Sequence, residues 1–348
     1  MGNRFDNVTR SLTSNSTITS TTFSTNVAVA GSITTSDGTQ FNTANSFGMR
    51  NRIINGGFDV WQRATSFASS SGSFNTAYTA DRWWMVDDAV GTVNITRQDI
   101  STLSMSSIYC IRAERTSGTN RWVVGTQLET IATKDLFGKT VTFSCKIRKG
   151  AGLTSDVGVA VATSTTEAKY GSVVDGSAAA ITATNASLNT STFTKFTYTF
   201  AIPSSSSALG FKVEFSALQT GATNAYFDIA EVQLEIGSVA TPFERRPYGL
   251  ELLLCQRYYE VQNFSYVTIG YKGGGIFFHI TKRAVPTVNF YTGQSLTGTS
   301  GSLLETQSSG SAFSVSTYGG TVDGLSNVNT SVAINATMSG SFAASAEL

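Results

Sequence analysis

The chain has 348 residues, of which 14% are charged against about 25% in an average globular protein, and its formal net charge is +1. This balance excludes the basic surface of a nucleic-acid-binding protein and an electrostatic attraction to anionic membranes. No run of residues reaches the roughly 20 apolar positions of a membrane-spanning helix, so we expect neither a nucleic-acid partner nor membrane insertion.

The first 50 residues are rich in Ser, Thr and Asn and poor in bulky apolar side chains. Short β-prone pieces occur at Thr17–Thr19 and Val27–Ala30, but they are too few to build a hydrophobic core. Two interpretations are open: a floppy tail, or an arm that becomes ordered between partner chains. We predict that residues 1–50 form an extended N-terminal arm used in assembly.

Residues 51–248 carry repeated strand patterns separated by turns of Gly, Ser and Asn. Apolar and polar residues alternate in three segments: Val141–Arg148, Phe196–Phe200 and Phe211–Phe215. In Tyr226–Ile236 the apolar positions change parity after Ile229, which predicts a β-bulge near Ala230–Glu231. Strands at this spacing predict a large β-sandwich rather than alternating strands and helices.

One convincing helix pattern follows Pro247. Within Leu250–Tyr259, apolar residues recur at helical spacing, at Leu250, Leu253, Leu254 and Tyr258. A helix this short must pack against something, and we expect a connector helix at 249–260. Strand patterns return in residues 261–348, at Ile276–Ile280, Val285–Phe290, Phe313–Tyr318 and Val332–Met338. The sequence thus predicts an all-β chain that ends in a second, smaller C-terminal β-sandwich.

Residues that commonly carry catalysis or bind metals are scarce. The only histidine, His279, lies in the apolar strand pattern Ile276–Ile280 and is predicted to be structural. The cysteines indicate neither a zinc site nor a disulfide framework, because they are few and far apart: Cys110, Cys145 and Cys255. The alternation of its strand places Cys145 in the core as a buried thiol.

The carboxylates of the chain form only a weak candidate site for acid–base catalysis. Asp228, Glu231 and Glu235 lie on one strand near the parity change, whereas glycoside hydrolysis needs two carboxylates at a defined separation. The sequence contains no GxSxG motif of serine hydrolases, no HExxH motif of zinc proteases and no P-loop or GxGxxG motif of nucleotide-binding proteins. We therefore predict a protein without enzymatic activity and without a catalytic cofactor.

Aromatic residues are the better lead to a binding site. Trp83 and Trp84 are neighbours on one predicted strand, so their rings point to opposite faces. An exposed aromatic ring can stack on the apolar face of a sugar while nearby polar groups bind its hydroxyls. This predicts a glycan-binding site formed by Tyr78, Asp81, Arg82, Trp83 and Trp84. In the alternative, one ring lies in the core and the other under a loop or at a subunit contact. Trp61 and Trp122 are predicted to be core residues.

Several segments resemble bacteriophage tail-fibre and other virion appendage proteins. The resemblance rests on residues 51–63 (NRIINGGFDVWQR), 78–83 (YTADRW), 228–244 (DIAEVQLEIGSVATPFE), 246–248 (RPY) and 254–259 (LCQRYY). A weaker match continues at residues 283–288 and 346–348. The resemblance therefore covers roughly residues 51–348, whereas the arm matches no segment of these proteins.

The resemblance implies a fold and a metal. Residues 51–248 would form a jelly-roll, galactose-binding-like β-sandwich of the kind seen in carbohydrate-binding modules. Such modules often hold a structural calcium ion, and the corresponding positions here are Asn55, Asp59 and Asp228. The chain departs from that pattern at Gly57, where the modules often have an acid.

The resemblance also implies a function. It predicts a non-enzymatic tail fibre that attaches the virion to a host surface polysaccharide, with residues 1–50 docking to another virion protein. It implies a symmetric homo-oligomer, usually a trimer, which is assembled in the host cytoplasm and exposed on the outside of the particle. The alternatives are a head fibre, a capsid decoration protein or a tail adaptor without receptor binding. A polysaccharide depolymerase is disfavoured, because the chain offers so little catalytic chemistry.

Overall fold

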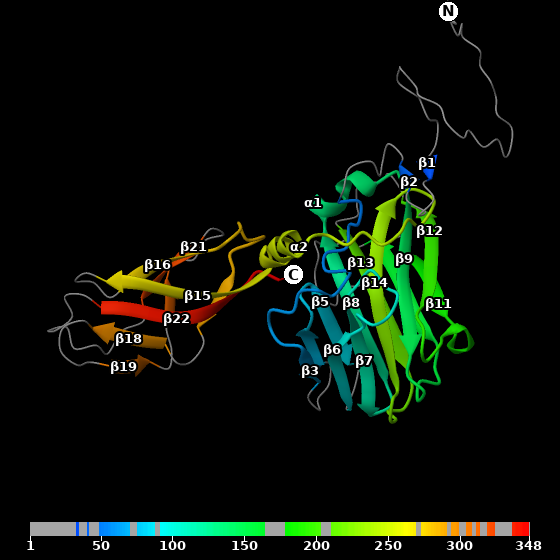
Figure 1. The fold of residues 1–348 in the computed structure, drawn as a ribbon, viewed down its shortest axis with the longest axis horizontal. Coiled ribbons are helices and arrows are strands. Elements are labelled where there is room, and N and C mark those ends of the chain that lie inside the picture. Colours follow the sequence, from blue (N-terminus) through cyan, green and yellow to red (C-terminus); the bar gives the residue numbers. More distant parts are fainter. Residues whose placement is uncertain are drawn as a thin grey trace, which may run out of the picture.

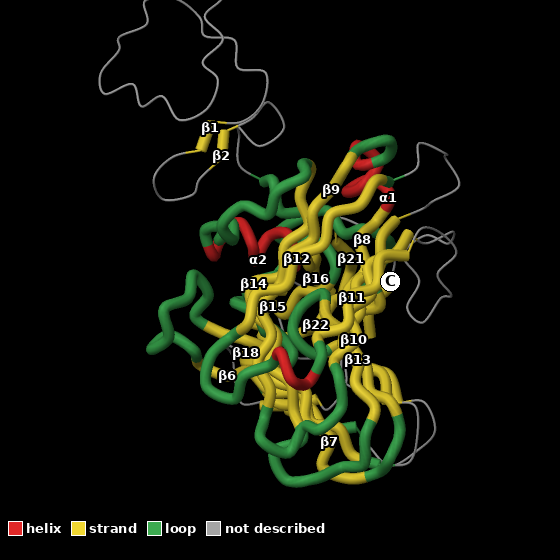
Figure 2. The backbone as a smooth tube through the Cα atoms, turned by 90° about the vertical axis from the view of Figure 1, so that its right-hand side faces the viewer, coloured by secondary structure: helices red, strands yellow, loops and turns green. Residues whose placement is uncertain are grey.

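The structure is a computed structural model, and it describes residues 33–34, 40–41, 49–69, 75–87, 91–163, 178–202, 210–268, 273–290, 294–298, 304–307, 311–313, 319–323 and 336–347. The described chain is nearly all β, as predicted, and Figure 2 shows how little of it is helical. Within the described residues, no helix is long and apolar enough to cross a membrane. Of the predicted arm, strands β1 (Ile33–Thr34) and β2 (Gln40–Phe41) pair with each other, whereas Thr17–Thr19 and Val27–Ala30 lie outside the described residues.

The larger region is a sandwich of two six-stranded antiparallel sheets (Figure 1). One sheet has the order β11 (Ala178–Ala183), β10 (Val157–Thr163), β13 (Gly210–Leu218), β8 (Arg121–Glu129), β5 (Trp83–Asp87) and β4 (Asn75–Tyr78). The other has the order β12 (Thr194–Ala201), β9 (Thr140–Lys149), β14 (Tyr226–Ile236), β7 (Tyr109–Ser117), β6 (Thr92–Asp99) and β3 (Ser66–Ala68). Short helical turns α1 (Thr130–Thr133), η1 (Lys134–Leu136) and η2 (Asn185–Ser187) connect strands. This confirms the predicted jelly-roll β-sandwich, and each of the four strand patterns identified between residues 141 and 236 forms a strand.

Alternate residues of the strands fill the space between the two sheets. On β9, Val141, Phe143, Cys145 and Ile147 are all buried. Trp122 stacks on Phe227 with ring centroids 5.9 Å apart, which confirms its place in the core. Trp61 is only partly buried and packs on the margin of this core. Each fully buried large apolar side chain contributes about 1.5–3 kcal/mol, so this layer dominates the stability of the sandwich.

The predicted bulge in β14 is confirmed, and it changes the partner of this strand. The register of β14 on β9 shifts between Ala230 and Gln233, and Glu231 has a left-handed φ of 51°. Beyond the bulge, the segment 51–56 takes the place of β7 beside β14. Arg52 N–H donates to Leu234 O (2.8 Å) and Val232 N–H donates to Gly56 O (3.0 Å). A Cβ at Gly56 would collide with the carbonyl of Val232, so this close approach requires glycine.

The connector helix exists but differs from its prediction. Helix α2 spans Tyr248–Gln256, so Tyr258 and Tyr259 lie outside it. Its buried residues are Glu251, Cys255 and Gln256, whereas Leu250 and Leu253 are 39% and 41% exposed. The inward face is polar because Glu251 accepts hydrogen bonds from Asn55 N–H (2.6 Å) and Arg246 Nη1 (3.1 Å). Of the predicted apolar pattern, Leu250 and Leu253 therefore lie off the buried face, whereas Leu254 is half-buried.

The chain after α2 forms a smaller β region. Its five-stranded sheet contains β15 (Tyr259–Thr268), β22 (Ala336–Ser345), β18 (Gln294–Gly298) and β19 (Leu304–Gln307), with β17 (Thr287–Phe290) also paired to β22. A three-stranded sheet contains β16 (Gly273–Phe277), β21 (Gly319–Asp323) and β20 (Ser311–Phe313). The predicted strand Val285–Phe290 is shorter than expected, because β17 begins at Thr287, and Ile276–Ile280 is displaced, because β16 spans Gly273–Phe277. Residues 314–318 and 332–335 lie outside the described chain. His279 lies beyond the end of β16 rather than on a strand.

Candidate functional site

The residues predicted to bind a glycan are almost completely buried. Asp81, Arg82, Trp83 and Trp84 are each at most 1% exposed, and Tyr78 is partly buried. The two tryptophan rings do point to opposite faces of β5. Trp83 lies in the core between the sheets, 6.2 Å from the Phe215 ring, and Trp84 packs with Val86 and Val123. As placed here, neither ring offers an open face to a sugar.

Arg82 joins the sandwich to the end of the chain instead. Its guanidinium forms an ion pair with Glu347, donates to Gln127 O (2.6 Å) and lies 3.6 Å from the ring centroid of Tyr258. Arg63 pairs with the same Glu347 carboxylate (3.3 Å). We call Arg63, Asp81, Arg82, Tyr258 and Glu347 the junction cluster. Figure 1 shows the C-terminus returning to this place beside α2.

Asp81 completes the junction cluster through Gln62. Its Oδ1 accepts a hydrogen bond from Gln62 N–H (2.9 Å), and Gln62 Nε2 donates both to Oδ2 and to Tyr259 O (2.7 Å). Burial raises the pKa of Asp81 to about 6. The YTADRW segment, which contributed to the resemblance, therefore acts here as the contact between the two β regions.

The three residues implied as calcium ligands do not fit a calcium ion. Asn55 uses its side chain to bind Val60 and the carbonyl of Asp81. Asp59 faces Arg245 (3.4 Å). Asp228 is buried between two arginines, with Arg112 Nε 2.8 Å from Oδ1 and Arg148 Nη2 2.5 Å from Oδ2. Two guanidinium groups already outweigh the single negative charge of Asp228, so it has no spare charge for a metal.

A Cβ added at Gly57 would lie 3.4 Å from the Phe243 ring and 3.4 Å from Ser107 Oγ. These are ordinary contact distances for one methyl group, so the space beside Gly57 faces Phe243 and Ser107. Throughout the described residues, no group of three or more His, Cys, Asp or Glu side chains is placed to hold a metal ion.

The other residues that could carry catalysis or bind a metal are Glu235, His279 and the three cysteines, and each of them is held in other contacts or buried. Glu235 accepts hydrogen bonds from Thr241 (2.7 and 2.9 Å) and from Gln233 (2.8 Å). His279 is exposed and contacts the buried Glu260, which also pairs with Lys282. The three cysteines are free and buried, which confirms the burial predicted for Cys145, and burial raises the pKa of Cys110 and Cys145. Their thiols are therefore unreactive at neutral pH.

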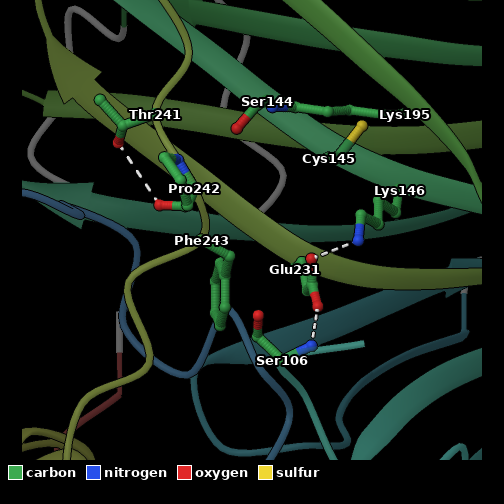
Figure 3. Close-up of a pocket in the computed structure, with 9 residues that line it drawn as sticks. All are labelled: Ser106, Ser144, Cys145, Lys146, Lys195, Glu231, Thr241, Pro242 and Phe243. Carbon is green, nitrogen blue, oxygen red and sulfur yellow. Dashed lines mark hydrogen bonds and ion pairs between the residues drawn. The ribbon is translucent and has the colours of Figure 1, made fainter. Parts of the chain in front are cut away.

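An open pocket lies on the outer face of the sandwich, where β14 bulges (Figure 3). We call it the bulge pocket. Its volume is about 210 Å³, and it is lined by Ser106, Ser144, Cys145, Lys146, Lys195, Glu231, Thr241, Pro242 and Phe243. β9, β12 and β14 form its floor, the connection between β6 and β7 supplies Ser106, and the segment after β14 supplies the apolar wall.

Glu231 organises the bulge pocket. Its Oε1 accepts hydrogen bonds from the backbone N–H groups of Ser106 (2.6 Å) and Ser107 (3.2 Å), and its Oε2 lies 2.8 Å from Lys146 Nζ. In Figure 3 the carboxylate lies between Lys146 and Ser106. The left-handed backbone at Glu231 is an unusual conformation for a residue with a side chain, and here it aims the carboxylate at both partners.

The pocket combines an apolar wall with polar groups on its floor. Phe243 and Pro242 form the wall, while the Ser144 hydroxyl and the Lys195 ammonium line the opposite side. This combination can hold a small ring that has one apolar face and several hydroxyls. Sequence reasoning located the bulge but missed the pocket, because no local motif links its contributing segments. The one sequence signal for the pocket was a lysine on each of two neighbouring strands, Lys146 on β9 and Lys195 on β12.

No protein-family model matches the chain, and no curated protein sequence matches it either. Among solved structures, the chain is similar to the enzymatically active domain of bacteriophage CBA120 tailspike protein 4, with 8% identity, a TM-score of 0.35 and coverage of 54% of this chain. The match spans 22% of that tailspike chain.

Two other similar structures are matched over most of their own length. A cyclase from Fischerella sp. has 12% identity and a TM-score of 0.36, covering 54% of this chain and 96% of the cyclase. The C-terminal family 22 carbohydrate-binding module of Clostridium thermocellum Xyn10B has 12% identity and a TM-score of 0.31, covering 53% of this chain and 93% of the module.

Proposed function

We propose that the chain is a non-enzymatic attachment protein of a bacteriophage tail fibre, which binds a host surface glycan through the bulge pocket. The observation that carries this proposal is the pairing of Phe243 and Pro242 with the polar floor of that pocket. An aromatic wall stacks on the C–H face of a sugar, and hydroxyl and ammonium groups bind the sugar hydroxyls.

The charges of the pocket support binding rather than hydrolysis. Glycoside hydrolysis uses two carboxylates that face the scissile bond. Glu231 is the one carboxylate among the residues that line the bulge pocket, and both of its oxygens are engaged. A sugar held there would meet hydrogen-bond donors but no acid–base pair.

The proposal also covers how the chain assembles and where it lies on the virion. Residues 1–50 would dock to another virion protein, and the chain would act as a homotrimer on the outside of the particle. Leu250 and Leu253 of α2 support self-association, because their apolar side chains are exposed on a helix whose polar residues face inward. Light scattering on the full chain tests this part: Leu253→Glu should lower the mass from trimer to monomer. A wild-type monomer at micromolar concentration would overturn it.

The attachment function is tested with the full purified chain and intact host cells. Phe243→Ala should reduce cell binding at least 10-fold, because it removes the apolar wall. Phe277→Ala is the matched control, since that ring is 77% exposed in the smaller β region, away from the pocket. Thermal unfolding of both variants must remain close to wild type.

Two outcomes contradict the attachment function. If wild-type oligomers bind neither cells nor purified surface polysaccharide, the protein does not attach the virion. If antibody labels the capsid instead of the tail, the structural head-fibre or decoration role replaces it. Release of reducing sugar from the polysaccharide would contradict the absence of enzymatic activity.

A further inference from the structure

The floor of the bulge pocket places two lysines directly opposite each other. Lys195 of β12 and Lys146 of β9 are register partners in the same antiparallel pair. Directly opposed residues have Cβ atoms about 4.5–5.5 Å apart on one face of the sheet, and like charges in this position repel. Both lysines line the pocket, so the repulsion is concentrated where a ligand would bind.

The protein compensates only one of these two charges. Glu231 lies 2.8 Å from Lys146 and also accepts hydrogen bonds from two backbone N–H groups. Lys195 forms no ion pair with any carboxylate of the described chain, and its side chain is exposed. Once Glu231 and Lys146 neutralise each other, the pocket retains one positive charge, at Lys195.

The size and the apolar wall define the rest of the ligand. A volume of about 210 Å³ is below the roughly 300–1,000 Å³ of pockets for drug-sized ligands, so one sugar ring is a suitable occupant. Phe243 supplies the surface for the apolar face of that ring, and Ser106 and Ser144 supply hydroxyls. A bare inorganic anion would leave this apolar wall unused.

We propose that the bulge pocket selects a monoanionic sugar, a hexuronic acid or another carboxylated monosaccharide, whose carboxylate binds Lys195. The inference rests on the proposed glycan attachment and adds the charge class of the receptor. The ligand carboxylate would balance the charge of Lys195, which Glu231 leaves uncompensated because it pairs with Lys146, whereas a neutral sugar would not. A dianionic sugar phosphate fits less well, because Glu231 lies on the same floor.

The test uses the full chain and matched pairs of monosaccharides, observed by ligand-detected NMR. The probes are methyl glucuronide against methyl glucoside, methyl galacturonide against methyl galactoside, and N-acetylneuraminic acid. At least one carboxylated sugar should bind 10-fold more tightly than its neutral counterpart. Lys195→Gln should remove this preference, because it deletes the charge and keeps a hydrogen-bonding side chain of similar length.

The controls separate this inference from the attachment function. Lys139→Gln removes an exposed lysine outside the pocket and should leave every affinity unchanged. Phe243→Ala should weaken carboxylated and neutral sugars alike. If neutral sugars bind as well as acidic ones, or Lys195→Gln retains the preference, the charge selectivity is wrong while attachment stands. If wild type binds no sugar in the panel and no host cell, both proposals fail.

Discussion

The junction cluster and the bulge pocket contain the same kinds of residue, aromatic rings beside charged groups, yet only one is open to a ligand. In the junction cluster, Arg82 finds an anion, a carbonyl and an aromatic face within the chain itself. In the bulge pocket, Lys195 faces another lysine and lacks a carboxylate partner among the described residues. The difference is whether the fold satisfies its own charges.

A motif dense in Trp, Arg and Asp is therefore a poor guide to a binding surface. Buried charges must be paired, so residues of this kind gather where two regions of a chain meet. Arg82 and Glu347 are 265 residues apart in sequence and form one buried ion pair. An unpaired cation beside a half-buried aromatic wall, as Lys195 is beside Phe243, is the better indication of a ligand site.

The largest loss of stability should come from a substitution that breaks the junction cluster. Arg82→Met keeps much of the side-chain volume but leaves Glu347 with Arg63 alone, and it removes the hydrogen bond to Gln127 O. We expect the free energy of unfolding to fall by about 3–5 kcal/mol, as for other broken buried ion pairs. Urea unfolding measures it. Asp135→Asn, whose carboxylate is 54% exposed in its pair with Arg52, should change stability by less than about 1 kcal/mol.

If Arg82→Met unfolds no more easily than Asp135→Asn, the two β regions are not coupled through this ion pair. Glu347→Gln provides a second measurement if the arginine variant is too unstable to purify. It should weaken the junction less, because the amide oxygen still accepts a hydrogen bond from Arg82.

The next effect is a dependence of stability on pH. Burial raises the pKa of Asp81 from an ordinary 3.8 to about 6. Between these values the folded chain keeps a proton that the unfolded chain has released, so the free energy of unfolding falls as pH rises. The contribution is fully present below pH 3.8, is lost as pH passes about 6, and amounts to about 3 kcal/mol.

Asp81→Asn should remove this pH dependence, because the amide stays neutral and still accepts the hydrogen bond from Gln62 N–H. The measurement is the difference in unfolding free energy between wild type and variant at pH values from 4 to 7. Asp135→Asn should leave the wild-type slope in this window. A slope equal in wild type and Asp81→Asn would mean that folding does not raise the pKa of Asp81.

A substitution with a smaller expected loss of stability tests whether the Trp84 side chain stays buried. Gly125 of β8 is opposite Trp84, and a Cβ added at Gly125 would collide with the indole ring. Gly125→Ala should cost about 1–3 kcal/mol, as overpacking usually does. Gly249→Ala is the control, since its added Cβ would meet no atom within 4 Å apart from its chain neighbours and the backbone of its own helix. If Gly125→Ala costs nothing and tryptophan fluorescence shifts to the red, Trp84 can turn outward to solvent.

The fold was predictable from sequence wherever an element depends on the pattern of its own residues. Alternation identified β9, β12 and β13, and the parity change in β14 located the bulge, because side chains of a strand alternate between faces. The inward face of α2 was not predictable, because it depends on Asn55, almost 200 residues earlier. The bulge pocket was missed for the same reason: Ser106, Lys195 and Phe243 come from separate segments that meet only in the folded chain.

The smallest change in stability is expected at Lys195, and it tests most directly whether the bulge pocket leaves a charge without a partner in the fold. A residue kept for binding contributes little to stability, and Lys195 also repels Lys146 across the pair of strands. Lys195→Gln should therefore leave the free energy of unfolding unchanged or raise it by up to about 0.5 kcal/mol. High salt should abolish any gain, because it screens the repulsion between exposed charges. A loss above about 1 kcal/mol would give Lys195 a structural partner, and the bulge pocket would then resemble the junction cluster, a place where the fold satisfies its own charges.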